Sequence, residues 1–124
     1  VAKIVVIFVE NKISLKKKTI SGKAVNGDRE TAVHLACRFG FRDILELLLK
    51  SNGNQSLKNI YKSTPLIIAI QNNKLNCIRV LKRYKVNFGE CSPNKSPLHY
   101  AIKQKNEDIV RYILQAMVGT VFFF

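Results

Sequence analysis

A short sequence pattern occurs three times in this chain at an almost constant spacing. The segments TAVHLA, TPLIIA and SPLHYA begin at residues 31, 64 and 96, so the period is 33 residues and then 32. A fixed period of this length is typical of repeat proteins, in which each unit buries its apolar face only by stacking on its neighbours. We therefore expect a row of stacked repeats in place of a single globular core.

An apolar helical stripe follows each copy of the pattern. Comparable stripes lie at residues 43–49, 76–81 and 108–114. The first stripe falls at positions i, i+1, i+4 and i+5, which form one face of an α-helix. Its residues are Ile44, Leu45, Leu48 and Leu49. Each repeat is therefore predicted to contain a helix, a tight connection, a second helix and an extended loop, which makes the fold all-α.

The residues that open each pattern suit the start of a helix. The hydroxyl groups of Thr31, Thr64 and Ser96 can accept hydrogen bonds from free backbone N–H groups. Proline follows at positions 65 and 97, where its missing N–H costs nothing. These residue types predict that the first helix of each repeat begins at the pattern.

These motifs resemble the ankyrin repeat, whose Thr-Pro-Leu-His-x-Ala signature recurs every 33 residues. The resemblance covers about residues 26–116 and implies an ankyrin-type helical repeat solenoid. It divides the chain into three ankyrin repeats, at residues 26–58, 59–91 and 92–124, the last with an apolar tail. Residues 1–25 are then a degenerate N-terminal repeat or cap that contains a basic loop.

The N-terminal segment fits the repeat less well. Its apolar residues at 4, 5, 8 and 9 copy the spacing of the first stripe and favour a helix, whereas the β-branched run at 4–7 suits a strand. Seven extra residues fall between this segment and the first pattern, near Lys16, Lys17 and Lys18. Because the chain has no initiating Met and ends in an apolar run, we interpret the sequence as a fragment.

The connection between the two helices differs among the three repeats. The resemblance places glycine at this turn, and the chain has Gly40, Asn73 and Lys105 there. Asparagine tolerates the left-handed backbone conformation that such a turn needs, whereas lysine pays a steric penalty. We expect a strained or reshaped turn at Lys105.

Positive charge is the main compositional bias of the chain. Lysine and arginine number 21 against 8 aspartate and glutamate residues, which gives a net charge of +13. Such a charge attracts an acidic protein surface, nucleic acid or an anionic membrane. The candidate basic patches are Lys16, Lys17 and Lys18 together with Arg79, Lys82 and Arg83, which share one helix face at i, i+3 and i+4. The alternative is that these lysine and arginine residues form solvated helix and loop faces that bind no ligand.

No arrangement of residues in the sequence points to catalysis or metal binding. Cys37, Cys77 and Cys91 lack the spacing of zinc ligands, and reduced thiols fit a cytoplasmic chain or a nuclear one. His34 and His99 share one motif position, where the resemblance implies a hydrogen bond to the turn before the helix. The sequence contains no phosphate-binding loop and no catalytic constellation, so we expect no enzyme activity, no cofactor and no metal.

The resemblance implies that the chain binds a partner protein through its concave face. In ankyrin-like arrays this face combines the loop tips before each pattern with exposed positions of the first helices. Mapped by position, the tip residues are Asn26, Asp28, Arg29, Asn59, Tyr61, Lys62, Pro93, Asn94 and Lys95. The helix residues are Arg38, Phe39, Gln71, Asn72, Lys103 and Gln104. We predict a protein-interaction scaffold for an acidic partner surface, with nucleic acid or an anionic membrane as the alternative ligand.

Overall fold

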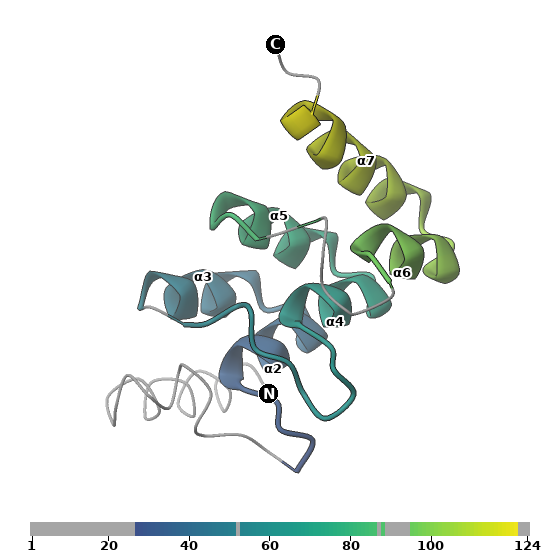
Figure 1. Cartoon of the computed structure of the whole chain (residues 1–124). Helices are drawn as coiled ribbons and strands as arrows, with labels where there is room; N and C mark the ends of the chain where they lie inside the picture. The colour runs from purple at the N-terminus through teal and green to yellow at the C-terminus, as the bar shows by residue number, and fades with distance from the viewer. Residues whose placement is uncertain (1–26, 52, 87, 89–94, 122–124) are drawn as a thin grey trace.

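The computed structural model of the chain describes residues 27–51, 53–86, 88 and 95–121 (Figure 1). These residues form α-helices that follow one another in three pairs. The pairs are α2 (Ala32–Phe39) with α3 (Arg42–Lys50), α4 (Pro65–Gln71) with α5 (Leu75–Arg83), and α6 (Pro97–Gln104) with α7 (Glu107–Val121). The predicted all-α solenoid of helical repeats is confirmed.

The helices lie in two layers (Figure 1). Helices α2, α4 and α6 form an inner layer in which each helix packs on the next, and α3, α5 and α7 form an outer layer. The loop between α3 and α4 lies beside the residues that precede α2, because the Ile60 N–H donates to the Asp28 carbonyl oxygen over 3.0 Å. The loops of successive repeats are therefore joined to one another as well as to their own helices.

The predicted helix starts are present. The Thr31 hydroxyl accepts a hydrogen bond from the His34 N–H, and the Thr64 hydroxyl accepts one from the Ile67 N–H, both at 3.4 Å. The His34 Nδ1 atom in turn accepts from the Thr31 N–H at 3.1 Å, and His99 makes the same bond to Ser96 at 3.2 Å. Both histidines thus bond the turn before their helix, as expected.

The three helix connections share one backbone conformation. Gly40, Asn73 and Lys105 have φ angles of 74°, 57° and 60°, all in the left-handed region. The strain expected at Lys105 is therefore confirmed, since a side chain in this conformation costs roughly 1–2 kcal/mol. At Gly40 an added Cβ atom would also lie 2.8 Å from the Cδ atom of Lys74.

Apolar side chains fill the space between the layers. Ala36, Ala69 and Ala101 are fully buried, which allows neighbouring inner helices to approach closely. Cys37 and Cys77 are also buried, as expected for thiols that act as small hydrophobic side chains, and burial raises the pKa of the Cys37 thiol. Because a single repeat could not bury this surface, stacking is what stabilises the fold.

Several sequence interpretations concern residues outside the described ones. These are the N-terminal repeat or cap at residues 1–25 with Lys16, Lys17 and Lys18, and the single residues Asn26, Cys91, Pro93 and Asn94. The repeat boundaries stay predictions. None of the described helices combines the length and the apolar character that crossing a membrane would require.

Candidate partner-binding surface

A buried asparagine shapes the loop between α3 and α4. Asn59 is 6% exposed, and its Oδ1 atom accepts hydrogen bonds from the backbone N–H groups of Tyr61 at 2.9 Å and Ser63 at 3.0 Å. Asparagine fixes turns in this way because its side chain replaces a backbone acceptor. Asn59 thus orders the loop, and we do not count it among the residues that a partner would touch.

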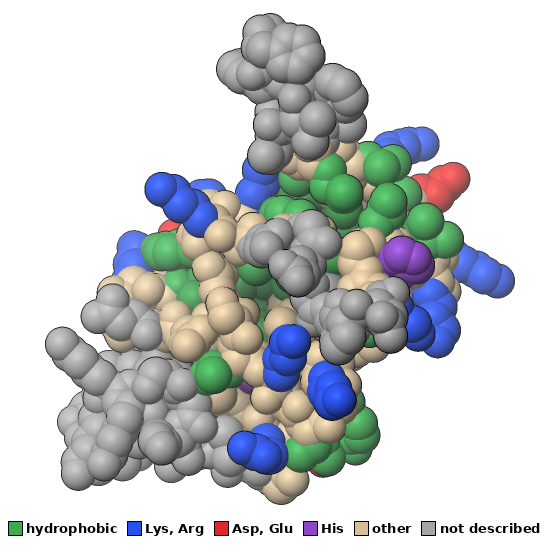
Figure 2. All heavy atoms as spheres, in the orientation of Figure 1, with side chains coloured by type: hydrophobic (Ala, Val, Ile, Leu, Met, Phe, Trp, Pro, Cys, Tyr) green, Lys and Arg blue, Asp and Glu red, His purple; other side chains and the backbone are tan. Residues whose placement is uncertain are grey.

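The loop that Asn59 orders presents Tyr61 and Lys62 to solvent. Tyr61 is 68% exposed, and Lys62 follows it in the left-handed conformation with a φ of 62°. Arg29 occupies the equivalent position of the preceding loop and has a φ of 60°. Lysine and arginine side chains gather over the loop between α3 and α4 (Figure 2). The two loops therefore offer an exposed ring and two cations at defined tips.

A buried carboxylate connects the first loop to α2 and to the second loop. Glu30 forms an ion pair with Arg38 of α2 and accepts a hydrogen bond from the Asn59 Nδ2 atom at 3.4 Å. A buried charge is stable only when it is paired, so this contact fixes the guanidinium of Arg38 beside the loop. Arg38 remains partly exposed and can still contact a partner.

The inner helices contribute a row of equivalent positions. Arg38, Gln71 and Lys103 occupy the same position on α2, α4 and α6, and the last two are exposed. Each polar group in this row lies one repeat from the next. The structure therefore places the predicted helix residues of this row at the surface.

The neighbouring helix positions are less uniform. Phe39 is exposed and stacks on Phe41, with 5.9 Å between the ring centroids. Asn72 is half-buried and donates from its Nδ2 atom to the Ile68 carbonyl oxygen at 2.8 Å, and Gln104 is also half-buried. Of this set, Phe39 is the side chain most open to contact.

Two further tip residues complete the surface. Asp28 is exposed, and the Lys95 Nζ atom lies 6.0 Å from the centroid of the Tyr100 ring. The described tip and helix residues, without the buried Asn59, are together called the inner surface below. Its members are Asp28, Arg29, Arg38, Phe39, Tyr61, Lys62, Gln71, Asn72, Lys95, Lys103 and Gln104.

A second group of basic side chains lies on the outer layer. The Arg79 Cζ atom and the Lys82 Nζ atom of α5 lie 5.7 Å and 5.5 Å from the centroid of the Tyr112 ring on α7. Arg83 donates to the Glu46 Oε1 atom of α3 at 3.0 Å. Two members of the i, i+3, i+4 set found in the sequence thus lie against an aromatic ring, and the third is paired with Glu46. We call Arg79, Lys82, Arg83 and Tyr112 the α5 cluster.

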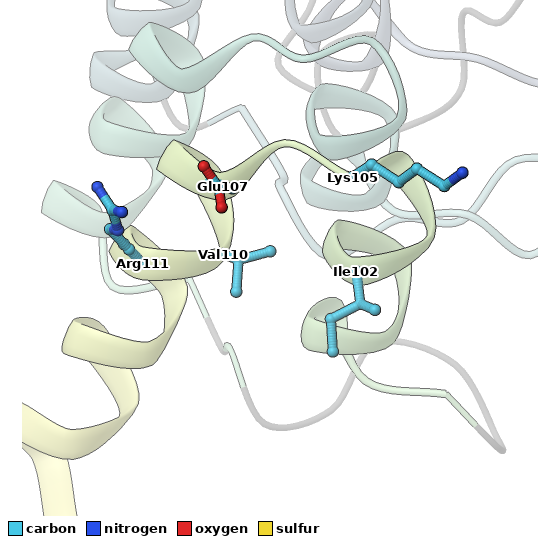
Figure 3. Close-up of a pocket in the computed structure, with 5 residues that line it drawn as sticks. All are labelled: Ile102, Lys105, Glu107, Val110 and Arg111. Carbon is cyan, nitrogen blue, oxygen red and sulfur yellow. The ribbon is translucent and has the colours of Figure 1, made fainter.

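A shallow hollow of about 480 Å³ lies between α6 and α7 (Figure 3). Its lining residues are Ile102, Lys105, Glu107, Val110 and Arg111. Ile102 is 58% exposed, whereas Ile70, one repeat earlier on α4, is 0% exposed. Across the described part of the chain, no group of three His, Cys, Asp or Glu side chains is placed to hold a metal ion.

The fold and these surfaces can be compared with known protein families. A family model described as "Ankyrin repeats (3 copies)" matches residues 3–88 and, in a second match, residues 34–120. This chain belongs to the ankyrin-repeat family. Ankyrin repeats are generally protein–protein interaction modules and typically have no catalytic role. The family thus supports a binding role for an ankyrin-repeat chain of this kind.

The ankyrin-repeat chain is similar to parts of much longer proteins. It is 34% identical over 84 residues to the transient receptor potential cation channel subfamily A member 1 homolog of Caenorhabditis elegans, which is 68% of the chain and 7% of that protein. It is 32% identical over 85 residues to alpha-latrotoxin-Lt1a of Latrodectus tredecimguttatus, which is 62% of the chain and 6% of the toxin. It is 26% identical over 81 residues to human ankyrin repeat and SOCS box protein 11, covering 65% of the chain and 25% of that protein. The ankyrin-repeat chain thus spans a quarter or less of each relative.

Two contacts at the candidate surfaces of the ankyrin-repeat chain were missed by sequence reasoning. Glu30 was not recognised as the partner of Arg38, and Tyr112 was not connected with Arg79 and Lys82. The repeat period is the signal that could have found the second feature. Residues about one period apart lie on neighbouring helices of the same layer, and Tyr112 follows Arg79 by 33 residues.

Proposed function

We propose that this ankyrin-repeat chain binds a partner protein through the inner surface. The observation that carries the proposal is Tyr61, a largely exposed aromatic ring on a loop that the buried Asn59 holds in shape. Tyrosine and arginine side chains dominate interface energies, and a fixed loop loses little conformational entropy on binding. The general role of ankyrin repeats supports the same function.

The charge of the inner surface favours an acidic partner. Five of its residues are basic, namely Arg29, Arg38, Lys62, Lys95 and Lys103, against the acidic Asp28. Complementary charge across an interface raises the association rate and rejects wrong partners. We therefore propose a partner that combines an apolar pocket for Tyr61 with surrounding carboxylates.

A reducing compartment is part of the same proposal. Cys37 and Cys77 are free thiols in the described structure, and both are buried. Free thiols persist in the reducing cytosol and nucleus, whereas oxidising compartments favour disulfides. The cytoplasm, or the nucleus, is accordingly where we expect the chain to meet its partner.

Site-specific photo-crosslinking tests the proposed surface. A photoreactive amino acid is placed at position 61 in one variant and, as a control, at position 47, where Leu47 is 43% exposed on the outer helix α3. We expect position 61 to capture a partner protein that position 47 does not capture. Identical crosslinked products from the two positions, or none from position 61, would show that the inner surface is not the binding site.

A further inference from the structure

We propose that the α5 cluster is a second binding site, which takes a short protein segment with adjacent aspartate or glutamate side chains. The cluster lies on the outer layer, whereas the inner surface lies on the loops and inner helices. The proposal therefore stands independently of the function proposed above.

Two cations of the α5 cluster share one aromatic ring. Arg79 and Lys82 lie 5.7 Å and 5.5 Å from the Tyr112 centroid, so their like charges are held near each other. The ring offers negative charge on its face, which offsets part of the repulsion and orients the guanidinium group. Within the described ranges, neither Arg79 nor Lys82 forms an ion pair. A carboxylate bound between them would supply the missing negative charge.

The third cation of the α5 cluster, Arg83, is held by a residue of α3. Arg83 is bound to Glu46 of α3 at 3.0 Å, so the cluster is connected to both neighbouring outer helices. Burial raises the pKa of the Tyr112 phenol, and the charges of Arg79 and Arg83 act in the opposite direction. The phenol is accordingly protonated at neutral pH, and its O–H is a further donor for a bound carboxylate.

Comparison among the repeats shows that stacking does not require these residues. Lys82 has Leu49 and Leu114 as its counterparts one repeat before and after, and Tyr112 has Leu47 as its counterpart in the first repeat. Lysine and arginine in the last turn of a helix are favoured by the helix dipole, which accounts for Lys82 and Arg83. That effect does not account for Arg79 or for the ring against it.

The surroundings of the cluster limit the size of its ligand. Asp43 on α3 is 91% exposed, and Glu107 and Asp108 are exposed at the start of α7, whereas α5 contains no acidic residue. Both neighbouring helices mix the two charges, because α3 also carries Arg42 and Lys50 and α7 also carries Arg111, so the uniformly positive area is about one helix wide. A nucleic-acid duplex needs an extended row of cations for its phosphates, and a membrane presents a broad negative plane. A short acidic peptide fits this narrow area better than either.

Peptide binding with charge-matched variants tests the site. The probe is a fluorescein-labelled twelve-residue peptide of Glu-Glu-Gly repeats, and binding is followed by fluorescence anisotropy at low and moderate salt. We expect the Arg79→Gln/Lys82→Leu variant to bind at least about tenfold more weakly than wild type, since charge-assisted hydrogen bonds are lost. The control Lys50→Gln/Lys58→Gln removes the same charge at exposed positions outside both the α5 cluster and the inner surface, and we expect less than about a twofold change.

The ring has its own variant. Tyr112→Leu removes the ring and the phenol but keeps the fold, because Leu47 occupies this position in the first repeat. We expect weaker peptide binding with an unchanged circular dichroism spectrum, and Lys82→Leu alone provides a second variant that the repeat tolerates. Equal weakening by the control pair, or no binding by wild type at low salt, overturns the proposal. Tighter binding of a charge-matched DNA duplex through Arg79 and Lys82 would assign the site to nucleic acid and also overturn it.

Discussion

The Nε2 atom of His34 lies 3.2 Å from the carbonyl oxygen of Ser63, which joins the first inner helix to the loop before the second. The Nδ1 atom of the same ring accepts the Thr31 N–H, so the bonded imidazole is neutral and carries its proton on Nε2. The ring is fully buried, and burial lowers the pKa of His34 below its ordinary value of 6.5. One side chain thus couples two repeats in a manner that depends on pH.

The stability of the fold should fall below neutral pH because of His34. The unfolded chain takes up a proton as the pH falls through 6.5, whereas the folded chain keeps the ring neutral. The stabilisation is therefore complete above pH 6.5 and is lost as the pH falls toward the folded-state pKa. We expect a slope of up to about 1.4 kcal/mol per pH unit from this proton. Urea unfolding at several pH values between 7.5 and 5 measures it.

The His34→Gln variant should be less stable than wild type at pH 7.5, and its free energy of unfolding should depend less on pH. His99→Gln is the matched control, because His99 makes the same bond to Ser96 but is exposed. It should keep the wild-type slope. Equal slopes for wild type and His34→Gln would contradict the role assigned to the buried ring.

Lys105→Gly should stabilise the fold. Lys105 adopts a φ of 60°, and glycine reaches this conformation without the steric cost of a Cβ atom. We expect a gain of about 1 kcal/mol in the free energy of unfolding, reduced by the greater freedom of glycine in the unfolded chain. The reverse change, Gly40→Ala, should destabilise the fold, since its φ is 74°. Chemical denaturation measures both, and a loss of stability in Lys105→Gly would refute the account of the turn.

Ile70→Ala and Ile102→Ala should differ greatly although they change equivalent positions. Ile70 of α4 is completely buried in the core, whereas Ile102 is exposed and borders the open hollow between α6 and α7. Removing a buried isoleucine costs about 2–5 kcal/mol, because a cavity is left as well as lost burial. The exposed position should cost less than about 1 kcal/mol. Similar losses in the two thermal unfolding curves would mean that another part of the protein covers Ile102.

Arg38→Met should destabilise the fold because it removes the ion-pair partner of the buried Glu30. Glu30 is buried, and without the guanidinium its carboxylate keeps only the hydrogen-bonding groups around it. We expect a loss of about 1–3 kcal/mol, an amount that allows for the partial exposure of Arg38. The double variant Glu30→Gln/Arg38→Met should recover part of the lost stability, because it no longer contains the buried carboxylate that has lost its guanidinium. A double variant that is less stable than the single one would contradict this explanation.

Features set by neighbouring residues and by the repeat period could be predicted from the sequence. Thr31 and Thr64 cap their helices, and Lys105 adopts the strained conformation, because each depends on residues within one turn. Roles that depend on contacts between repeats could not be assigned in this way. Asn59 has the position of a loop-tip contact, but stacking buries it against Glu30.

The binding affinity of the crosslinked partner for two alanine variants tests the central claim most directly. Tyr61→Ala and Leu47→Ala each remove one exposed apolar side chain, the first from the inner surface and the second from the outer layer. Isothermal titration with the purified partner should show at least about tenfold weaker binding for Tyr61→Ala and less than about twofold for Leu47→Ala. Equal affinities for Tyr61→Ala and wild type, or a larger loss for Leu47→Ala, would contradict binding through the inner surface.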